Sequence, residues 1–179
     1  FKILDKARAR IKELPNIKTS LPTVAIAGFP NVGKSTLLGK LTDSKPEIKS
    51  YAFTTKALMI GYAIKDEKKI QIIDTPGTLN RFEKMNKIEK MAHLCMKYSA
   101  SAIIYVFDLS EISYPVHEQI QLFNEAKKLN KEIYVYFSKS DILSKDLITK
   151  FMKESKIKGL TESEKLKQQL LSLDSQSEC

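Results

Sequence analysis

The sequence predicts an α/β fold built on a mostly parallel sheet. Apolar, strand-length segments alternate with helical segments along most of the 179 residues. The run SAIIYVFD at 101–108 is almost continuously apolar, as a central strand buried on both faces should be. Two further strands, at 57–64 and 69–74, interrupt the alternation, because the short charged turn KDEKK can only join them as an antiparallel hairpin.

The remaining elements follow from hydrophobic periodicity and from residues that end helices. In chain order we expect a helix at 1–14 ended by Pro15, a strand at 23–27, a helix from a glycine-rich turn to about residue 41, a polar loop at 43–56, helices at 83–98 and 116–129, a strand at 133–137, and helices at 144–154 and 161–173. We expect three parts: a helical lead-in at 1–20 that is the stub of a missing N-terminal domain, the main domain at 21–173, and a disordered tail at 174–179.

The composition is that of a globular protein, with 42% hydrophobic and 28% charged residues, and no apolar run approaches the length that crosses a bilayer. The formal net charge of +9 favours a polyanionic partner such as RNA, or an acidic membrane surface. A surface that only keeps the protein in solution also accounts for this charge. The two cysteines, Cys95 and Cys179, argue against a structural disulfide and for a reducing compartment, the cytoplasm.

The strongest motif is the segment GFPNVGKS at 28–35, which matches G-x-x-x-x-G-K-[ST] between a predicted strand and a predicted helix. Gly28 and Gly33 let the backbone curl so that successive N–H groups face phosphate oxygens. Lys34 can reach the β- and γ-phosphates, and the Ser35 hydroxyl can coordinate Mg²⁺. The motif predicts a nucleoside triphosphate site, and a simple glycine turn before a helix is a much weaker interpretation.

Two further motifs stand at predicted strand ends. The segment DTPG at 74–77 places Asp74 where a carboxylate can hold magnesium, directly or through water, and Gly77 where its N–H can reach the γ-phosphate. The segment SKSD at 138–141 follows the strand IYVYF and resembles the Asn-Lys-x-Asp motif that reads guanine, with Ser138 in place of Asn. In that interpretation Asp141 accepts two hydrogen bonds from guanine and the Lys139 stem packs on the base. The alternatives are a turn for the first motif and a helix cap for the second.

Together the segments PTVAIAGFPNVGKSTL, KPEIKSYAFTTKALMIGY, IQIIDTPGTLNR and QIQLFNEAKKL resemble the nucleolar-GTPase (Nog) branch of the Obg superfamily. The resemblance runs from about residue 1 to 141. It implies a Ras-like P-loop GTPase domain: a six-stranded sheet with one antiparallel edge strand, and helices on both faces. It also implies a monomeric GTP-hydrolysing switch that acts in assembly of the large ribosomal subunit and binds its rRNA or precursor particle. In the family a Ser-Ala loop contacts the base before the last helix, and here 157–160 is its degenerate counterpart.

The resemblance and the motifs define one predicted site for GTP or GDP with Mg²⁺. We expect catalytic roles for Lys34, Thr55, Gly77 and Asn31, and metal ligands from Ser35, Thr55 and Asp74. The predicted nucleotide contacts come from the phosphate loop, the segment after it and the base motif: Asn31, Val32, Gly33, Lys34, Ser35, Thr36, Phe53, Thr54, Thr55, Asp74, Gly77, Ser138, Lys139 and Asp141.

Hydrolysis should be slow, because Thr78 stands where Ras-type enzymes carry the glutamine that orients water. A potassium ion is a further candidate cofactor, since the Asn31 amide resembles the one that binds it in potassium-activated GTPases. Three alternatives stay open: a nucleotide-dependent ribosome-binding scaffold with negligible turnover, an ATPase of the same superfamily, and a membrane-associated GTPase, for which no insertion helix is visible. Arg81 as an internal arginine finger and His93 as a ligand are weaker candidates.

Overall fold

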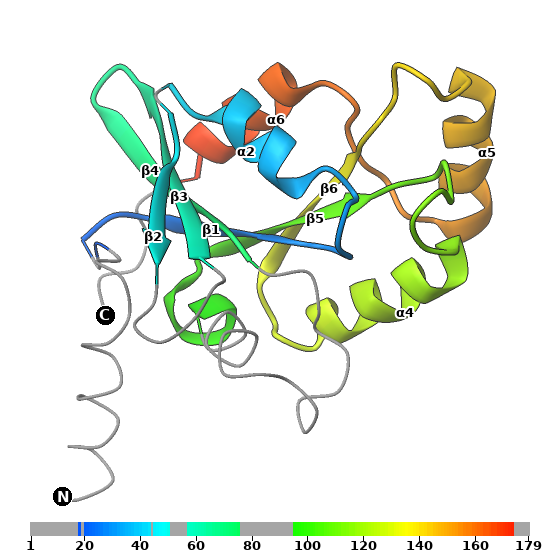
Figure 1. Ribbon diagram of the computed structural model, residues 1–179, viewed down its shortest axis with the longest axis horizontal. Coiled ribbons are helices and arrows are strands. Elements are labelled where there is room, and N and C mark those ends of the chain that lie inside the picture. The colour runs from blue at the N-terminus through cyan, green and yellow to red at the C-terminus, as the bar shows by residue number, and fades with distance from the viewer. Residues whose placement is uncertain (1–17, 19, 44, 51–56, 76–94, 174–179) are drawn as a thin grey trace, which may run out of the picture.

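The computed structural model describes residues 18, 20–43, 45–50, 57–75 and 95–173, and these form one α/β layer structure (Figure 1). Its sheet has six strands in the order β2-β3-β4-β1-β5-β6. The strands are β1 (Thr23–Ala27), β2 (Glu47–Ser50), β3 (Ala57–Lys65), β4 (Lys68–Asp74), β5 (Ala102–Phe107) and β6 (Glu132–Phe137). The helices are α2 (Lys34–Leu41), α4 (Val116–Lys127), α5 (Lys145–Ser155) and α6 (Ser163–Leu171), with a π-helical turn, η2, at Cys95–Ser99.

The strand pairing agrees with the predicted fold class and corrects one detail. Strand β1 pairs in parallel with β4 and β5, and β5 pairs in parallel with β6. The one antiparallel strand is β3, which pairs with β4 on one side and with β2 on the other. It therefore lies next to the edge rather than at it, because Glu47–Ser50, inside the stretch expected to be a loop, forms the outermost strand. An edge strand needs no continuous apolar pattern, so its polar sequence gave no strand signal.

Helices cover both faces of the sheet (Figure 1). Helices α2 and α6 pack together and against β3 and β4, whereas α4 packs on β5 from the opposite face. The predicted helices at 116–129, 144–154 and 161–173 are confirmed to within two residues at each end. The helix expected at 1–14, most of the one expected at 83–98 and the tail at 174–179 lie outside the described residues. Within the described part, no helix is both long and apolar enough to span a membrane.

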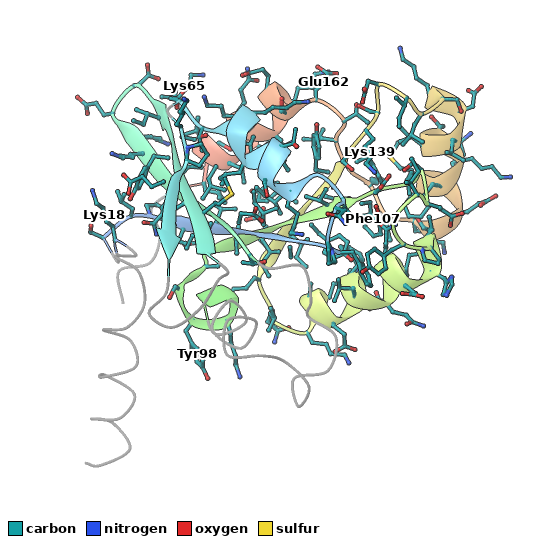
Figure 2. The ribbon with its side chains drawn as sticks, in the orientation of Figure 1. Lys18, Lys65, Tyr98, Phe107, Lys139 and Glu162 are labelled. Carbon is teal, nitrogen blue, oxygen red and sulfur yellow. The ribbon has the colours of Figure 1, made fainter. Side chains whose placement is uncertain are left out.

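An aromatic cluster joins the last two strands to α4 and α5. The ring of Phe107 is fully buried, and its centroid lies 4.7 to 6.0 Å from those of Tyr105, Phe123, Phe137 and Phe151. Burying each such ring contributes roughly 1.5–3 kcal/mol to stability. The cluster therefore fixes the carboxyl ends of β5 and β6, where Phe107 and Lys139 lie close together (Figure 2).

A glycine lets the end of α2 approach the sheet closely. A Cβ atom added to Gly61 of β3 would lie 2.2 Å from the Thr42 methyl group, 3.1 Å from its Cβ and 3.2 Å from Leu38 Cδ1. Thr42 cannot easily move, because its amide and its hydroxyl both donate to the Leu38 carbonyl, at 3.1 and 2.9 Å. Gly61 therefore sets how closely the helix that follows the glycine-rich turn packs on the sheet.

We expect Gly61→Ala to destabilise the protein by about 1–3 kcal/mol, because overpacking forces α2 away from β3. The melting temperature should fall by about 2–4 °C per kcal/mol in a chain of this size. Gly39→Ala is the matched control: an added Cβ there meets nothing within 4 Å, so we expect a gain of roughly 0.5–1 kcal/mol from helix propensity. Thermal unfolding measures both effects. Adding Thr42→Ser to the Gly61→Ala variant should recover part of the lost stability, because serine lacks the methyl group that clashes. A Gly61→Ala variant as stable as the wild type would contradict the packing argument.

Candidate nucleotide-binding site

The turn between β1 and α2 forms a phosphate loop whose backbone only certain residues can adopt. Gly28 has φ of 143° and Gly33 has φ of 95°, and Asn31 is also left-handed with φ of 62°. A side chain at Gly28 is further excluded because its Cβ would lie 2.8 Å from the Val106 carbonyl oxygen of β5. Gly33 is the N-cap of α2 and offers no side-chain cap, so the N–H groups at this helix end stay available to an anion.

The side chain of Lys34, the first residue of α2, folds back onto the phosphate loop. Its side chain is buried, and Nζ donates to the Phe29 carbonyl at 2.7 Å. Burial lowers the pKa of Lys34, and the nearby Asp74 carboxylate only partly offsets this effect. A desolvated ammonium is stabilised by incoming negative charge, so this arrangement suits a phosphate chain.

Ser35 and Asp74 meet at the start of α2 and the end of β4. The Ser35 hydroxyl donates to Asp74 Oδ2 at 2.6 Å, while Asp74 Oδ1 is buried without a hydrogen-bond partner among the described residues. Burial raises the pKa of Asp74, against the opposing effects of the Ser35 bond and the Lys34 charge. A buried, unpartnered carboxylate oxygen beside a hydroxyl fits a hydrated Mg²⁺ ion, which binds few protein ligands and keeps several waters.

A cavity of about 800 Å³ lies beside this loop and reaches the SKSD motif at 138–141. Four segments line it: the phosphate loop and α2, the end of β6, the motif that follows β6, and the start of α6. The lining residues are Asn31, Gly33, Thr36, Leu37, Lys40, Tyr136, Ser138, Lys139, Ser140, Asp141, Thr161, Glu162, Ser163 and Glu164. Its volume is in the range of small-molecule sites.

Ser138 joins the two halves of the site. It is buried, its amide and hydroxyl donate to the Phe107 carbonyl at 2.9 and 3.1 Å, and a Cβ added to Gly33 would lie 3.5 Å from Ser138 Cβ. A small residue therefore fits between the phosphate loop and the end of β5. Asp141 is exposed and lines the cavity, where its carboxylate is accessible to a base.

Lys139 has a partner that the sequence analysis missed. Its Nζ lies 2.6 Å from Oδ2 of Asp108, a carboxylate directly after β5 whose side chain is 1% exposed. Burial alone would raise the pKa of Asp108, but the bonds from Lys139 and Ser110 outweigh it and hold the pKa below its ordinary value. The two residues are 31 positions apart in the sequence, so no local pattern predicts their contact.

The wall at the start of α6 also differs from the expectation. We expected 157–160 to supply the base-contacting loop, but Leu160 pairs with β6: its amide donates to the Val135 carbonyl at 2.9 Å, and its carbonyl accepts from Phe137 N at 2.8 Å. The cavity wall is instead formed by Thr161, Glu162, Ser163 and Glu164. The apolar Leu160, directly before the helix already expected from residue 161, is the signal that could have placed a strand end here.

The structure thus brings most of the described candidates together. Asn31, Gly33, Thr36, Ser138, Lys139 and Asp141 share one cavity, while Lys34, Ser35 and Asp74 lie together where β4 ends and α2 begins. Val32 is fully buried, so only its backbone can serve a nucleotide. Phe53, Thr54, Thr55, Gly77, Thr78, Arg81 and His93 lie outside the described residues. Within the described ranges, no three His, Cys, Asp or Glu side chains gather into a metal-binding group.

We expect Asp74→Asn to stabilise the nucleotide-free protein while weakening Mg²⁺-dependent nucleotide binding. Replacing a buried, half-satisfied carboxylate by a neutral amide removes a cost of about 1–3 kcal/mol, which corresponds to about 2–4 °C in melting temperature per kcal/mol. Because the folded pKa is raised, the charged form costs stability at neutral pH, and this cost disappears as the pH falls through the folded pKa. The gain should therefore be largest at neutral pH and shrink in acid.

Thermal unfolding of the nucleotide-free protein across pH measures the change in stability. GDP titrations with and without Mg²⁺ measure the change in Mg²⁺-dependent binding. Asp146→Asn makes the same change at an exposed position in the first turn of α5, and we expect no gain in stability there. A drop in stability for Asp74→Asn at neutral pH would contradict the burial argument.

Comparison with known proteins agrees with this geometry. The sequence pattern of the family described as 50S ribosome-binding GTPase matches residues 23–139, which span the phosphate loop, Asp74 and the start of the base motif. An uncharacterised protein of Methanocaldococcus jannaschii is 46% identical over 145 residues, which cover 79% of this chain and 40% of that protein. Nucleolar GTP-binding protein 1 of Saccharomyces cerevisiae is 39% identical over 144 residues, which cover 78% of this chain and 22% of the yeast protein.

One solved structure is similar over nearly its whole length. The crystal structure of a nucleolar GTP-binding protein 1 chain from Plasmodium falciparum is 30% identical, with a TM-score of 0.65, and the match covers 90% of this chain and 91% of that one. The curated relatives above are much longer than the present chain, which spans between 22% and 40% of their length. The fold, the phosphate loop and these similarities agree, and the chain belongs to the 50S ribosome-binding GTPase family, in its nucleolar-GTPase (Nog) branch.

Proposed function

We propose that this chain is the GTP-hydrolysing core of a molecular switch that acts in assembly of the large ribosomal subunit. The observation that carries the proposal is the junction of two half-sites: the phosphate loop with Ser35 and Asp74, and the cavity lined by Lys139 and Asp141. One half suits a magnesium-bound phosphate chain and the other suits a purine base. The names of the relatives, a nucleolar GTP-binding protein and a ribosome-binding GTPase family, supply the ribosomal context.

Each described residue has a defined task in this proposal. Lys34 and the loop N–H groups bind the phosphates, and Asp141 accepts from the guanine N1–H and exocyclic amine. Ser35 and the Asp74 region would hold Mg²⁺, with Thr55 as the further proposed ligand. The ion supplies positive charge that offsets the negative charge of the β- and γ-phosphates. We expect the parts of 43–56 and 75–83 other than strand β2 to order around the γ-phosphate, with Gly77 donating to it, and to relax afterwards.

Turnover by this core is slow in the proposal, because Thr78 is too short to orient the attacking water as a glutamine does. In the proposal the Asn31 amide helps instead through a potassium ion. Asn31 is exposed and lines the cavity beside the phosphate loop. A monovalent cation at this edge of the phosphates offsets charge that develops in the transition state.

A basic groove on another side of the molecule supports an RNA-containing partner. A cavity of about 410 Å³ between the end of α4, the start of β6 and the segment after α5 carries four lysines, Lys127, Lys131, Lys156 and Lys158. Among its described lining residues there is no carboxylate. Such a groove suits the phosphate backbone of rRNA, with affinity that falls as salt rises.

The remaining parts of the proposal concern organisation and place. We infer a monomeric domain at 21–173; the lead-in expected at 1–20 and the tail expected at 174–179 lie almost wholly outside the described residues. The chain acts where large-subunit precursors are assembled, which is the cytoplasm in a cell without a nucleolus and the nucleolus in a cell that has one. A scaffold with negligible turnover and an ATPase are the competing functions, and Asp141 favours guanine over adenine.

The decisive experiment changes the base that the protein reads. Asp141→Asn should weaken GTP binding by roughly 1.5–3 kcal/mol, because a charge-assisted hydrogen-bonded pair is lost, and it should favour xanthosine triphosphate, whose carbonyl can accept from the new amide. Full-length wild-type protein should co-sediment with large-subunit precursors in a non-hydrolysable GTP analogue but not in GDP. The variant should need the xanthosine analogue instead.

Asp146→Asn, an identical change outside the cavity, should behave as wild type. Charge reversal of Lys156 and Lys158 should weaken co-sedimentation without changing nucleotide affinity, if the groove contacts RNA. Co-sedimentation that ignores the nucleotide would favour the scaffold, and competition by ATP as strong as that by GTP would favour the ATPase.

The potassium proposal predicts faster GTP turnover in potassium than in sodium at equal ionic strength. Asn31→Gly should abolish the difference, because glycine accepts the left-handed backbone at this position but brings no amide oxygen. Single-turnover phosphate release in the two salts measures the effect. Equal wild-type rates in both salts would remove the cation from the proposal, and fast turnover without any partner would contradict the slow intrinsic rate.

A further inference from the structure

Asp108 is a buried acidic residue that stands behind the base side of the cavity without lining it. Its Oδ1 accepts from the Ser110 amide at 3.0 Å and from the Ser110 hydroxyl at 2.5 Å. Its Oδ2 accepts from Lys139 Nζ at 2.6 Å. Each carboxylate oxygen therefore has a fixed partner, and the second one is directed at the lysine of the base motif.

The backbone of Asp108 is fixed equally firmly. The buried side chain of Gln119 on α4 contacts it twice: the Asp108 amide donates to Oε1 at 2.8 Å, and Nε2 donates to the Asp108 carbonyl at 2.7 Å. Nε2 also donates to the Tyr114 carbonyl at 2.9 Å, and the Tyr105 hydroxyl donates to the Gln119 carbonyl at 2.6 Å. The position of the carboxylate is thus set by the core of the domain and does not depend on a bound ligand.

Lys139 connects this fixed carboxylate to the cavity. Its backbone is left-handed, with φ of 54°, and the residue lines the cavity while the ammonium is bound to Asp108. Its side chain is 28% exposed, and the described ion pair Lys128–Glu125 on the surface leaves its lysine 69% exposed. A long side chain with its end tied down has few rotamers left to lose when a base packs on its stem.

The simplest alternative is a purely structural role, in which the Lys139–Asp108 ion pair only joins the segments that follow β5 and β6. Buried ion pairs, however, add little stability over well-packed apolar residues, since desolvation offsets most of the attraction. An ion pair with one member in the ligand cavity and the other fixed by the core points to positioning instead.

We propose that Asp108 is a positioning residue for guanine recognition: it holds Lys139 so that the lysine stem forms one wall of the base site before the nucleotide arrives. The inference rests on the guanine-nucleotide binding proposed above. It assigns the two parts of the motif different tasks, with Asp141 identifying the base and Lys139, through Asp108, supplying a preformed surface for it.

The test is a set of GDP dissociation constants for Asp108→Asn, Lys139→Met and the double variant, because methionine keeps an apolar stem but has no ammonium. We expect each single change to raise the dissociation constant about tenfold, and the double variant to be no weaker than the weaker single one, since both remove the same interaction. Two comparison ligands localise the loss. Inorganic pyrophosphate binding should be unchanged, and the ratio of GDP to inosine diphosphate affinity, which reports Asp141, should also be unchanged.

Glu125→Gln, which removes a lysine–carboxylate pair of the same 2.6 Å length on the surface of α4, should leave all of these values at wild type. If Asp108→Asn does not fold, Ser110→Ala carries the test, because it removes one bond that aims the carboxylate and should raise the GDP dissociation constant a few-fold. Additive single effects, an unchanged dissociation constant, or an equal loss for pyrophosphate would each overturn the inference. Wild-type protein that binds ADP as well as GDP would instead overturn the guanine assignment itself.

Discussion

The close approach of Gly28 to strand β5 is the constraint on which the whole site depends. With φ of 143° and the Val106 carbonyl 2.8 Å from where a Cβ would lie, this position accepts only glycine, and the phosphate loop starts in direct contact with β5. The end of β5 and the residue after it then serve the other half of the site: the Phe107 carbonyl accepts from Ser138, and the Asp108 carboxylate accepts from Lys139. The proposed phosphate and base sites are therefore aligned through one buried strand, whose position the aromatic cluster around Phe107 fixes.

The parts of this arrangement that the sequence predicted are local in the chain. Three features can each be recognised from a few consecutive residues: the phosphate loop, Asp74 at the end of β4 and the motif after β6. Their chemistry needs fixed spacings next to a strand. The fold class was predicted for the same reason, since apolar runs and helical periodicity are local signals. The sequence also predicted that Lys139 and Asp141 share one loop. It did not show which residues hold that loop in position.

What the sequence did not reveal depends on contacts between distant segments. Asp108 follows a strand like many surface aspartates, and only the fold shows that Gln119 and Lys139 meet around it. The polar strand β2 exists because β3 offers it an edge, not because of its own propensity. Residues 157–160 resembled the missing base loop, yet the pairing of Leu160 with β6 moves the cavity wall to Thr161 and the residues after it. Tertiary pairing decided each of these cases.

The buried Lys34 and the half-buried Lys139 differ in their surroundings, and their partners explain the difference. Lys34 donates to a backbone carbonyl, and the Asp74 carboxylate offsets only part of the effect of burial, which lowers the pKa of Lys34. Negative phosphate oxygens relieve that cost, which directs binding energy to this point. Lys139 has its ammonium paired with the Asp108 carboxylate, so little electrostatic attraction is left for a ligand in the cavity that this residue lines. In the proposed function the same residue type thus recognises charge in one half of the site and an uncharged ring in the other. The choice between the two roles is made by whether the fold places a carboxylate behind the lysine.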